Sequence, residues 1–322
     1  MSQSMSSKDQ QILRELAKRK LEIVHDPINV ERRDAWYVHQ SADESRPMIL
    51  AEFAAIVDEK RPFLPELICQ DELARHFEYA LRSEIWRFEW LRDDYVLEPF
   101  FNVSWDVTIS DYGVQTKWET SSDAGVLGAK RWDGAIRQGQ VGLLQPRTFS
   151  VSRETSLQRK HIAEEAFGSI LPVRFRGRHW WTMGMSQTAV YLIGLENLML
   201  WMYDDPDGLH QLMRFLCDDH LDFITWYERE GLLTLNNEND YVGSGSMGYT
   251  KVLPQPDWRE GDPVRCKDCW VLLESQETVG VSPELFDEFV LQYQREIGAR
   301  FGLTYYGCCE PVHSRWEVLK TL

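Results

Sequence analysis

The sequence predicts an α/β protein with parallel strands. From about residue 99 onward, short apolar segments alternate with longer amphipathic segments, which is typical of strands joined by crossover helices. Polar or thiol-bearing residues follow several of the apolar segments directly, as expected where parallel strands end at a functional edge. The sequence contains neither a short repeat nor a linker that would separate two domains.

The first 98 residues favour helices. Apolar residues recur at helical spacing in two segments, the first containing Ile12 and Leu16 and the second Phe77 and Leu81. The elements expected here are a helix over 7–24, a helical turn over 29–34, a strand over 47–53 and a helix over 66–91.

The rest of the chain supplies the alternating elements. We expect strands at 99–109, 171–177, 232–236, 269–274 and 303–306, and a further one hidden at 149–151. Helices are expected at 152–167, 191–203, 206–230, 282–301 and from 314 onward, with hairpins or loops over 110–150. Boundary residues support two of these helices. Pro206 lies just inside one start and Gly231 just past its end, while Ser282 precedes Pro283 as an N-cap.

Composition excludes several classes of function. The 322-residue chain has 35 Lys+Arg against 51 Asp+Glu, and a net charge of −16 disfavours binding to nucleic acid. It has no apolar run of roughly 18 residues and no apolar N-terminal signal, so we expect a cytoplasmic protein without a membrane partner. In that setting its 6 cysteines are expected to be free, metal-binding or catalytic rather than disulfide-bonded.

The segment LTYYGCCEP, residues 303–311, carries the strongest chemical signal. Cys308, Cys309 and Glu310 follow its strand, with His313 close behind. Thiolates, carboxylates and imidazoles are the ligands of zinc, so these four residues are candidate metal ligands. The alternative is that one cysteine belongs to the core and the other is incidental.

Other strand ends carry further candidates. Glu238 follows the strand at 232–236 and is a candidate zinc ligand or general base, the alternative being a solvated loop acid. Asp106 is a candidate catalytic residue facing the same edge. His179, Trp180 and Trp181 follow the strand at 171–177 and are candidates to line a pocket, although a histidine packed among aromatic rings is common in cores.

Two more groups leave alternatives open. Cys266 and Cys269 have the spacing of zinc or redox motifs. They could join Cys308 and Cys309 in a four-cysteine site, or be a loop pair without function. Glu274 and Glu277 follow the strand at 269–274 and either orient a ligand or lie at the surface.

From residue 171 on, a series of landmarks resembles the uroporphyrinogen decarboxylase superfamily. The most specific, VSPELFDEFV at 281–290, is close to the family's "lSPelFeeFv" helix start. The other landmarks, in order, are PVRFRG at 172–177 followed by Trp181-Thr182-Met183 in place of "G-P-(F/W)-T", YLIGLE at 191–196, MYDDPD at 202–207, the strand with an acidic tip at 233–239, and 303–309 where the family has "HxCG". The match covers roughly half the chain, and the first 98 residues match only loosely.

The resemblance implies a (β/α)8 TIM barrel with its site at the C-terminal mouth. Residues 1–98 would form a helical extension and the first barrel elements, and residues 99–322 the barrel itself. Because closure takes eight strands and the chain stops within the helix after the cysteine strand, we expect a barrel incomplete at its C-terminus and a longer parent chain.

The family contains two chemistries. The porphyrin decarboxylases carry an Arg-Gln-Ala-Gly-Arg segment that holds substrate carboxylates, which this chain lacks; Arg32-Arg33 and Arg46 have neither the glycine nor the glutamine. The methyltransferases use zinc held by His-x-Cys and a later cysteine. Here Tyr306-Gly307-Cys308 stands at that position, so the histidine is missing. Cys309, Glu310, His313 and Glu238 are the available substitutes.

The expected function is therefore a zinc-dependent methyltransferase of the corrinoid type. It would move a methyl group between a corrinoid, carried by a small partner protein, and a thiol or other small-molecule acceptor in one-carbon metabolism. In this hypothesis Glu238, Asp106 and His179 are catalytic, and Trp180 and Trp181 contact the corrinoid. The alternatives are a decarboxylase of porphyrin biosynthesis and a non-enzymatic barrel that binds a tetrapyrrole against its tryptophans.

Overall fold

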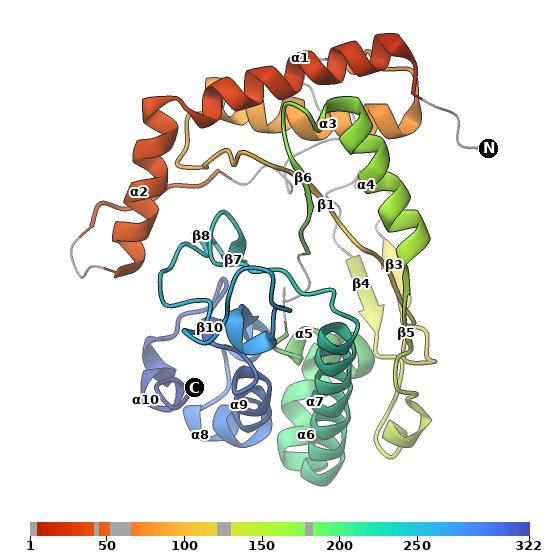
Figure 1. Cartoon of the computed structure of the whole chain (residues 1–322). Helices are drawn as coiled ribbons and strands as arrows, with labels where there is room; N and C mark the ends of the chain where they lie inside the picture. The colour runs from red at the N-terminus through yellow and green to blue at the C-terminus, as the bar shows by residue number, and fades with distance from the viewer. Residues whose placement is uncertain (1–4, 42–44, 52–65, 121–129, 178–182) are drawn as a thin grey trace.

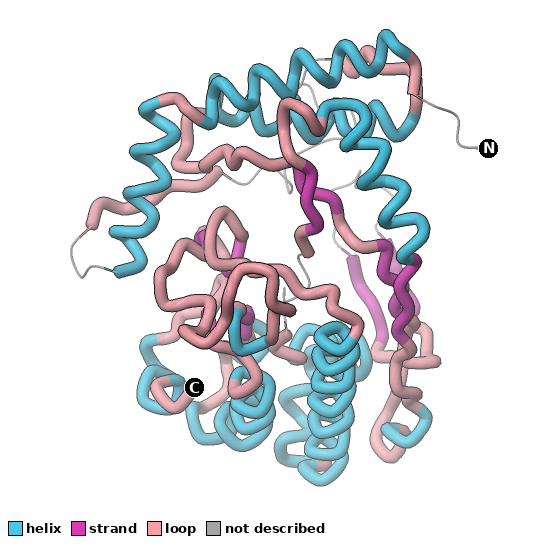
Figure 2. The backbone as a smooth tube through the Cα atoms, viewed as in Figure 1, coloured by secondary structure: helices cyan, strands magenta, loops and turns pink. Residues whose placement is uncertain are grey.

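The structure is a computed structural model, described over residues 5–41, 45–51, 66–120, 130–177 and 183–322. It is a mixed α/β protein with many helices and several two-stranded sheets (Figure 2). An N-terminal helical layer lies at the top of Figure 1, and the C-terminal helices lie at the bottom with the β7–β8 ribbon between them. Within the described ranges, no sheet closes into a barrel.

The N-terminal layer forms as the apolar patterns predict, with changed boundaries. Helix α1 (Ser7–Val24) has the predicted limits, and the Ser6 side chain caps it by accepting from the Asp9 amide. Helix α2 (Pro27–Ser41) is much longer than the turn expected at 29–34. Helix α3 (Glu72–Trp86) begins later than expected because Asp71 caps it, and it ends in a π-helical turn at Arg87–Leu91.

Two strands pack under this layer. Strand β1 (Phe101–Val103) pairs in parallel with β6 (Val173–Phe175), and helix α4 (Arg153–Phe167) connects them. Alternate strand residues join α1, α3 and α4 in one apolar core; the members from the two strands are Phe101, Val103, Val173 and Phe175. The residues between them, Asn102 and Arg174, therefore point to the opposite, inner face.

A second parallel pair packs on the C-terminal helices. Strand β9 (Trp270–Leu273) pairs with β10 (Leu303–Tyr306), whose limits are those predicted. The helices here are α5 (Ser186–Ile193), α6 (Leu195–Asp204), α7 (Pro206–Arg229), α8 (Pro283–Phe286), α9 (Gln292–Gly298) and α10 (Trp316–Leu319). The helix expected at 191–203 is interrupted at Gly194, whose φ of +89° ends α5.

The expected strand at 232–236 is an extended segment rather than a regular strand. The Asn236 side chain exchanges two hydrogen bonds with the backbone of Trp270, at 2.8 and 3.0 Å. Thr234 accepts from the Gly177 amide at 3.1 Å. Side-chain bonds thus replace the backbone ladder and hold the segment between β6 and β9. We call the series β1, β6, 232–236, β9 and β10 the strand arc.

Several sequence predictions need correction. The strand expected at 99–109 is two strands, since β2 (Asp106–Ile109) leaves the arc and pairs antiparallel with β5 (Phe149–Ser152). The strand at 149–151 therefore exists but lies outside the arc. Residues 47–51 form no regular strand, because the backbone of Ile49 bonds only to Asp94; residues 52–53 lie outside the described residues. A hairpin of β3 (Lys117–Thr120) and β4 (Lys130–Asp133) agrees with the expected loops and hairpins.

The inner face of β9 and β10 is covered by the ribbon β7 (Tyr241–Gly243) and β8 (Ser246–Met247). The Tyr305 ring packs on Gly243, where a Cβ atom would lie 2.2 Å from the ring, and its hydroxyl donates to the Ser244 carbonyl oxygen. Helix α2 closes over the ribbon, with Tyr37 and Trp36 packed on Tyr249. None of the described helices has the length and apolar character needed to cross a membrane.

Helical spacing predicts an inner stripe of Leu285, Phe286, Phe289, Tyr293 and Ile297 for the helix that begins after Ser282, and all of these are buried except Leu285, which is half-buried. A π-helical turn at Asp287–Leu291 divides this helix.

Ser282→Ala removes the hydroxyl that accepts from the Leu285 amide at 3.3 Å, and should lower the free energy of unfolding by about 1 kcal/mol. Urea unfolding measures the loss. Ser282→Asp, which keeps an acceptor, is the control, and equal stability of all three proteins would contradict the capping role.

Candidate functional site

The C-terminal ends of the arc bring polar side chains to one edge. The strands are parallel within each pair, so the two tips of β1 and β6 face the same way, as do those of β9 and β10. Arg176 follows β6, Glu238 follows segment 232–236, Glu274 follows β9 and Cys308 follows β10. The edge thus has two ends of different chemistry, an ion-paired end near β6 and a thiol end near β10.

The thiol end is built on a turn with a glycine. Gly307 has φ of +127°, a conformation that disfavours side chains, and its amide donates to the Leu273 carbonyl oxygen of β9 at 3.0 Å. Beyond it the sulfur atoms of Cys308 and Cys309 lie 3.9 Å apart. Cys308 is half-buried and Cys309 is exposed. Burial, together with Cys309, raises the pKa of Cys308, so its thiol is protonated at neutral pH.

This spacing suits two thiolates on one metal ion. Zinc–sulfur bonds of about 2.3 Å in a tetrahedron place the two sulfurs about 3.8 Å apart. The other predicted ligands do not join the pair. His313 is exposed in a 3-10 turn, and Glu310 is turned toward β9. In the described part of the chain, no three His, Cys, Asp or Glu side chains are placed to hold a metal. The described residues therefore supply two ligands and do not by themselves make a zinc site.

Glu310 is engaged in other contacts. One carboxylate oxygen accepts from the Ser275 amide at 2.9 Å, and the other lies 3.4 Å from Nη1 of Arg315. The side chains of Glu310 and Arg315 are 1% and 3% exposed. Burial raises the pKa of Glu310, an effect that the Ser275 amide and Arg315 oppose. This geometry is that of an internal anchor.

Glu274 is the main site residue that sequence reasoning left undecided. It follows β9, the direct neighbour of β10, and only 1% of it is exposed. Burial, and next the charge of Glu277, raise the pKa of Glu274 to about 7, so it can exchange a proton at neutral pH. The sequence signal for a buried carboxyl was the position of Glu274 directly after the apolar run WVLL, because a residue there shares the burial of the strand.

Arg176 dominates the other end. Its guanidinium bonds to Glu98 at 2.6 Å and to both carboxylate oxygens of Asp240, and all three side chains are at most 10% exposed. Burial lowers the pKa of Arg176, but its bonds to Asp240 and Glu98 outweigh burial and raise it. Arg174 adds a second contact to Glu98 at 3.0 Å. Both arginines are thus neutralised within the protein.

Glu238 belongs to the ion-paired end. It lies in the loop just before Asp240 and is exposed as a residue, yet burial of its carboxyl is the main cause of its raised pKa, followed by the charge of Glu98. Strand β9 lies between segment 232–236 and β10, so Glu238 and Cys308 do not follow neighbouring strands. Glu274, not Glu238, is the acid beside the thiols in strand order.

The remaining candidates are dispersed. Asp106 begins β2, and its backbone amide donates to the Ser156 hydroxyl of α4. His179, Trp180 and Trp181 lie outside the described residues. Cys266 and Cys269 are buried at the start of β9, where burial raises the pKa of each thiol. Because β9 and β10 are parallel, these two cysteines lie at the opposite end of the strands from Cys308, and this excludes the four-cysteine site.

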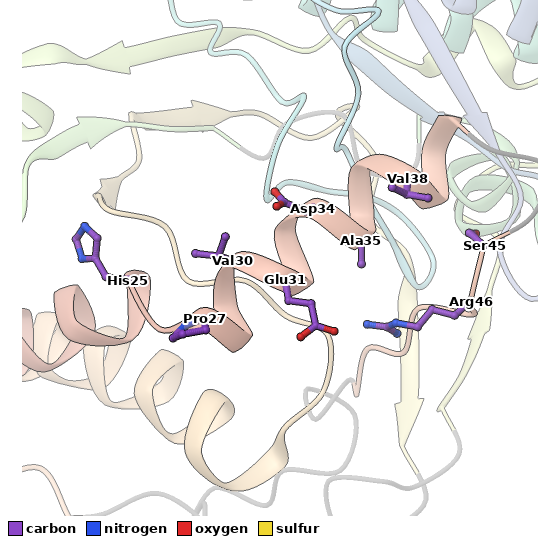
Figure 3. A pocket seen from close by; sticks show the side chains of 9 residues that line it. All are labelled: His25, Pro27, Val30, Glu31, Asp34, Ala35, Val38, Ser45 and Arg46. Carbon is purple, nitrogen blue, oxygen red and sulfur yellow. The ribbon is translucent and has the colours of Figure 1, made fainter.

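A separate open groove of about 780 Å³ runs along α2 (Figure 3). It is lined by His25, Pro27, Val30, Glu31, Asp34, Ala35, Val38, Ser45 and Arg46. Helical spacing puts these α2 residues on the face opposite Trp36, which packs on Tyr249. The groove is therefore distinct from the edge formed by the strand tips.

Comparison of the chain with family models, curated proteins and solved structures found no match. The resemblance to the uroporphyrinogen decarboxylase superfamily thus rests on the sequence landmarks alone.

Replacing the buried arginine tests the ion-paired end. Arg176→Met leaves Glu98 and Asp240 largely buried without their shared counterion, and should lower the free energy of unfolding by about 3 to 5 kcal/mol in urea unfolding. Arg214→Met is the matched control, because its pair with Glu296 is exposed and should cost less than about 1 kcal/mol. Similar losses in both variants would contradict the assigned role.

The raised pKa of Glu274 predicts a pH-dependent stability. The folded state holds this proton more tightly than the unfolded state, whose pKa is near 4.5, so stability falls as pH rises from 4.5 to about 7. Glu274→Gln should therefore be more stable than the native protein by about 1 to 3 kcal/mol at pH 8, a gain that shrinks toward pH 5. Thermal unfolding at both pH values measures this, with exposed Glu317→Gln as control. A gain independent of pH would refute the assignment.

Proposed function

We propose that the strand arc is part of a (β/α)8 barrel of the uroporphyrinogen decarboxylase type. Three features of the arc support this. Its paired strands are parallel, helices lie in every connection between its successive members except that from segment 232–236 to β9, which contains the β7–β8 ribbon, and polar residues follow its C-terminal tips, where such barrels carry their sites. Helix α4 connects the first two members, α7 precedes the third, and α8 and α9 connect the last two.

For this barrel we propose methyl transfer at the thiol end, with a corrinoid on a partner protein as methyl donor and a thiol as acceptor. The observation that carries the proposal is the thiol pair Cys308–Cys309, with sulfurs 3.9 Å apart at the tip of β10. Thiolate sulfur is a strong nucleophile toward carbon. In the transfer a carbon–sulfur bond forms and the carbon–cobalt bond breaks, and its electron pair stays with the corrinoid.

The residues at this edge can manage the proton that the reaction releases. The acceptor thiol must lose its proton before its sulfur attacks the methyl carbon. Glu274, on the adjacent strand tip, has a pKa of about 7 and suits the role of proton acceptor. Zinc binding at the pair remains part of the proposal, but no step is assigned to it, because the described residues offer two ligands only.

The arginines favour methyl transfer over porphyrin decarboxylation. A porphyrin with several carboxylates needs cations that are free to bind them. Arg174 and Arg176, on the inner face of the arc, are instead bonded to Glu98, Asn102 and Asp240. A decarboxylase that used these arginines would have to break their contacts to bind its substrate.

Metal analysis and a methyl-transfer assay test the proposal. Purified protein should contain about one zinc per chain, and Cys308→Ser/Cys309→Ser should lose it. Cys266→Ser/Cys269→Ser, which alters as many thiols at the opposite strand end, should keep it if it remains folded. With free methylcobalamin and 2-mercaptoethanol, the native protein should demethylate the corrinoid at least about tenfold faster than Cys308→Ser/Cys309→Ser.

The alternatives give different results. Equal rates for the native protein and Cys308→Ser/Cys309→Ser would overturn methyl transfer at the pair. Release of carbon dioxide from uroporphyrinogen would establish the decarboxylase. Metal-free protein that binds a corrinoid or porphyrin without turnover would identify a binding protein.

A further inference from the structure

The turn that carries the thiols is fastened to β9 on both sides. Before the pair, the Gly307 amide donates to the Leu273 carbonyl oxygen at 3.0 Å. After it, the Glu310 carboxylate accepts from the Ser275 amide at 2.9 Å. Cys308 and Cys309 are the only residues between these anchors. Their positions relative to the tip of β9 therefore depend on both.

The second anchor is held by a closed ring of buried bonds. Arg315 lies 3.4 Å from Glu310 and donates to the Thr278 hydroxyl at 3.1 Å. Thr278 in turn bonds to the Ser275 hydroxyl and carbonyl, at 2.8 and 2.9 Å. Ser275 completes the ring by its amide bond to Glu310. The guanidinium also lies over the Phe286 ring, at 4.4 Å from its centre, which ties this ring of bonds to the core.

We propose that Glu310 is a positioning residue that, together with Arg315, fixes the Cys308–Cys309 pair against the tip of β9. Both carboxylate oxygens of Glu310 face donors of the protein, so its role differs from the metal ligation that the sequence suggests. This inference rests on the proposed function of the thiol pair. Its test measures thiol geometry without methyl transfer, so the two can fail separately.

Phenylarsine oxide is a suitable probe because it reads the spacing of two thiols. It forms two arsenic–sulfur bonds, and its oxygen leaves as water with the two thiol protons, so no oxidant is needed. The other cysteines, Cys69, Cys217, Cys266 and Cys269, are buried and should not react in the folded protein. Titration by calorimetry should give one site per chain, absent in Cys308→Ser/Cys309→Ser.

Glu310→Ala should weaken phenylarsine oxide binding by about 10- to 100-fold, the effect typical of losing a group that orients metal ligands. Glu310→Gln keeps an oxygen for the Ser275 amide and should fall between Glu310→Ala and the native protein. Glu317→Ala is the matched control, since that carboxylate on α10 is 82% exposed and should leave binding unchanged. Titrations are run well below each melting temperature, which separates thiol geometry from global stability.

Native phenylarsine oxide affinity in folded Glu310→Ala would overturn the proposal. If that variant also lost zinc, Glu310 would be a ligand instead. If Glu310→Ala fails to fold because Arg315 is left buried and unpaired, Glu310→Ala/Arg315→Met removes both charges and takes its place. The same loss of affinity is expected, and native affinity would again refute the role.

Discussion

A guanidinium buried between two carboxylates joins the two halves of the strand arc. Arg176 comes from the end of β6, Glu98 from the chain before β1, and Asp240 from the loop after segment 232–236. Taking three charges out of water is costly, and that cost is offset only when every charge has its partners in good geometry. The network therefore favours one relative placement of these three segments. The loop with Asp240 leads into the β7–β8 ribbon, which covers the inner face of β9 and β10.

The chemistry at the two ends of the edge follows from how their charges are neutralised. Near β6, the Arg176 guanidinium is bonded to the carboxylates of Glu98 and Asp240, so its donors are occupied and not free to bind an anion. Near β10, the described groups include several acids and thiols, with Arg315 as a buried cation. With little positive charge nearby, burial favours the protonated forms of Glu274 and Cys308, and the pKa of each is raised. Glu274, whose pKa is about 7, exchanges its proton at neutral pH and is the group at this end suited to acid–base chemistry.

Local signals predicted the elements that local interactions build. Helix α1 and strand β10 have the predicted limits, because a continuous apolar pattern and nearby end signals define them. The prediction of a regular strand at 232–236 is wrong, because Asn236 bonds to the Trp270 backbone through its side chain and not through a backbone ladder. The sequence predicts Glu310 as a metal ligand from its place beside the two cysteines, whereas its actual partner, Ser275, lies 35 residues away in sequence. Contacts at that separation leave no trace in spacing or composition.

The backbone at Gly307 explains how Cys308 reaches the inner side of the arc. Tyr306 faces outward, where its ring meets Phe286 in an edge-to-face contact at 6.3 Å. Residues two apart on a regular strand point the same way, so Cys308 would also face the helices if β10 continued. The φ of +127° at Gly307 breaks that alternation, and Ser244 of the inner ribbon hydrogen-bonds Cys308 instead. A histidine in place of Tyr306 would therefore start from the outward face, so its absence removes no ligand from the side on which the Cys308 thiol lies.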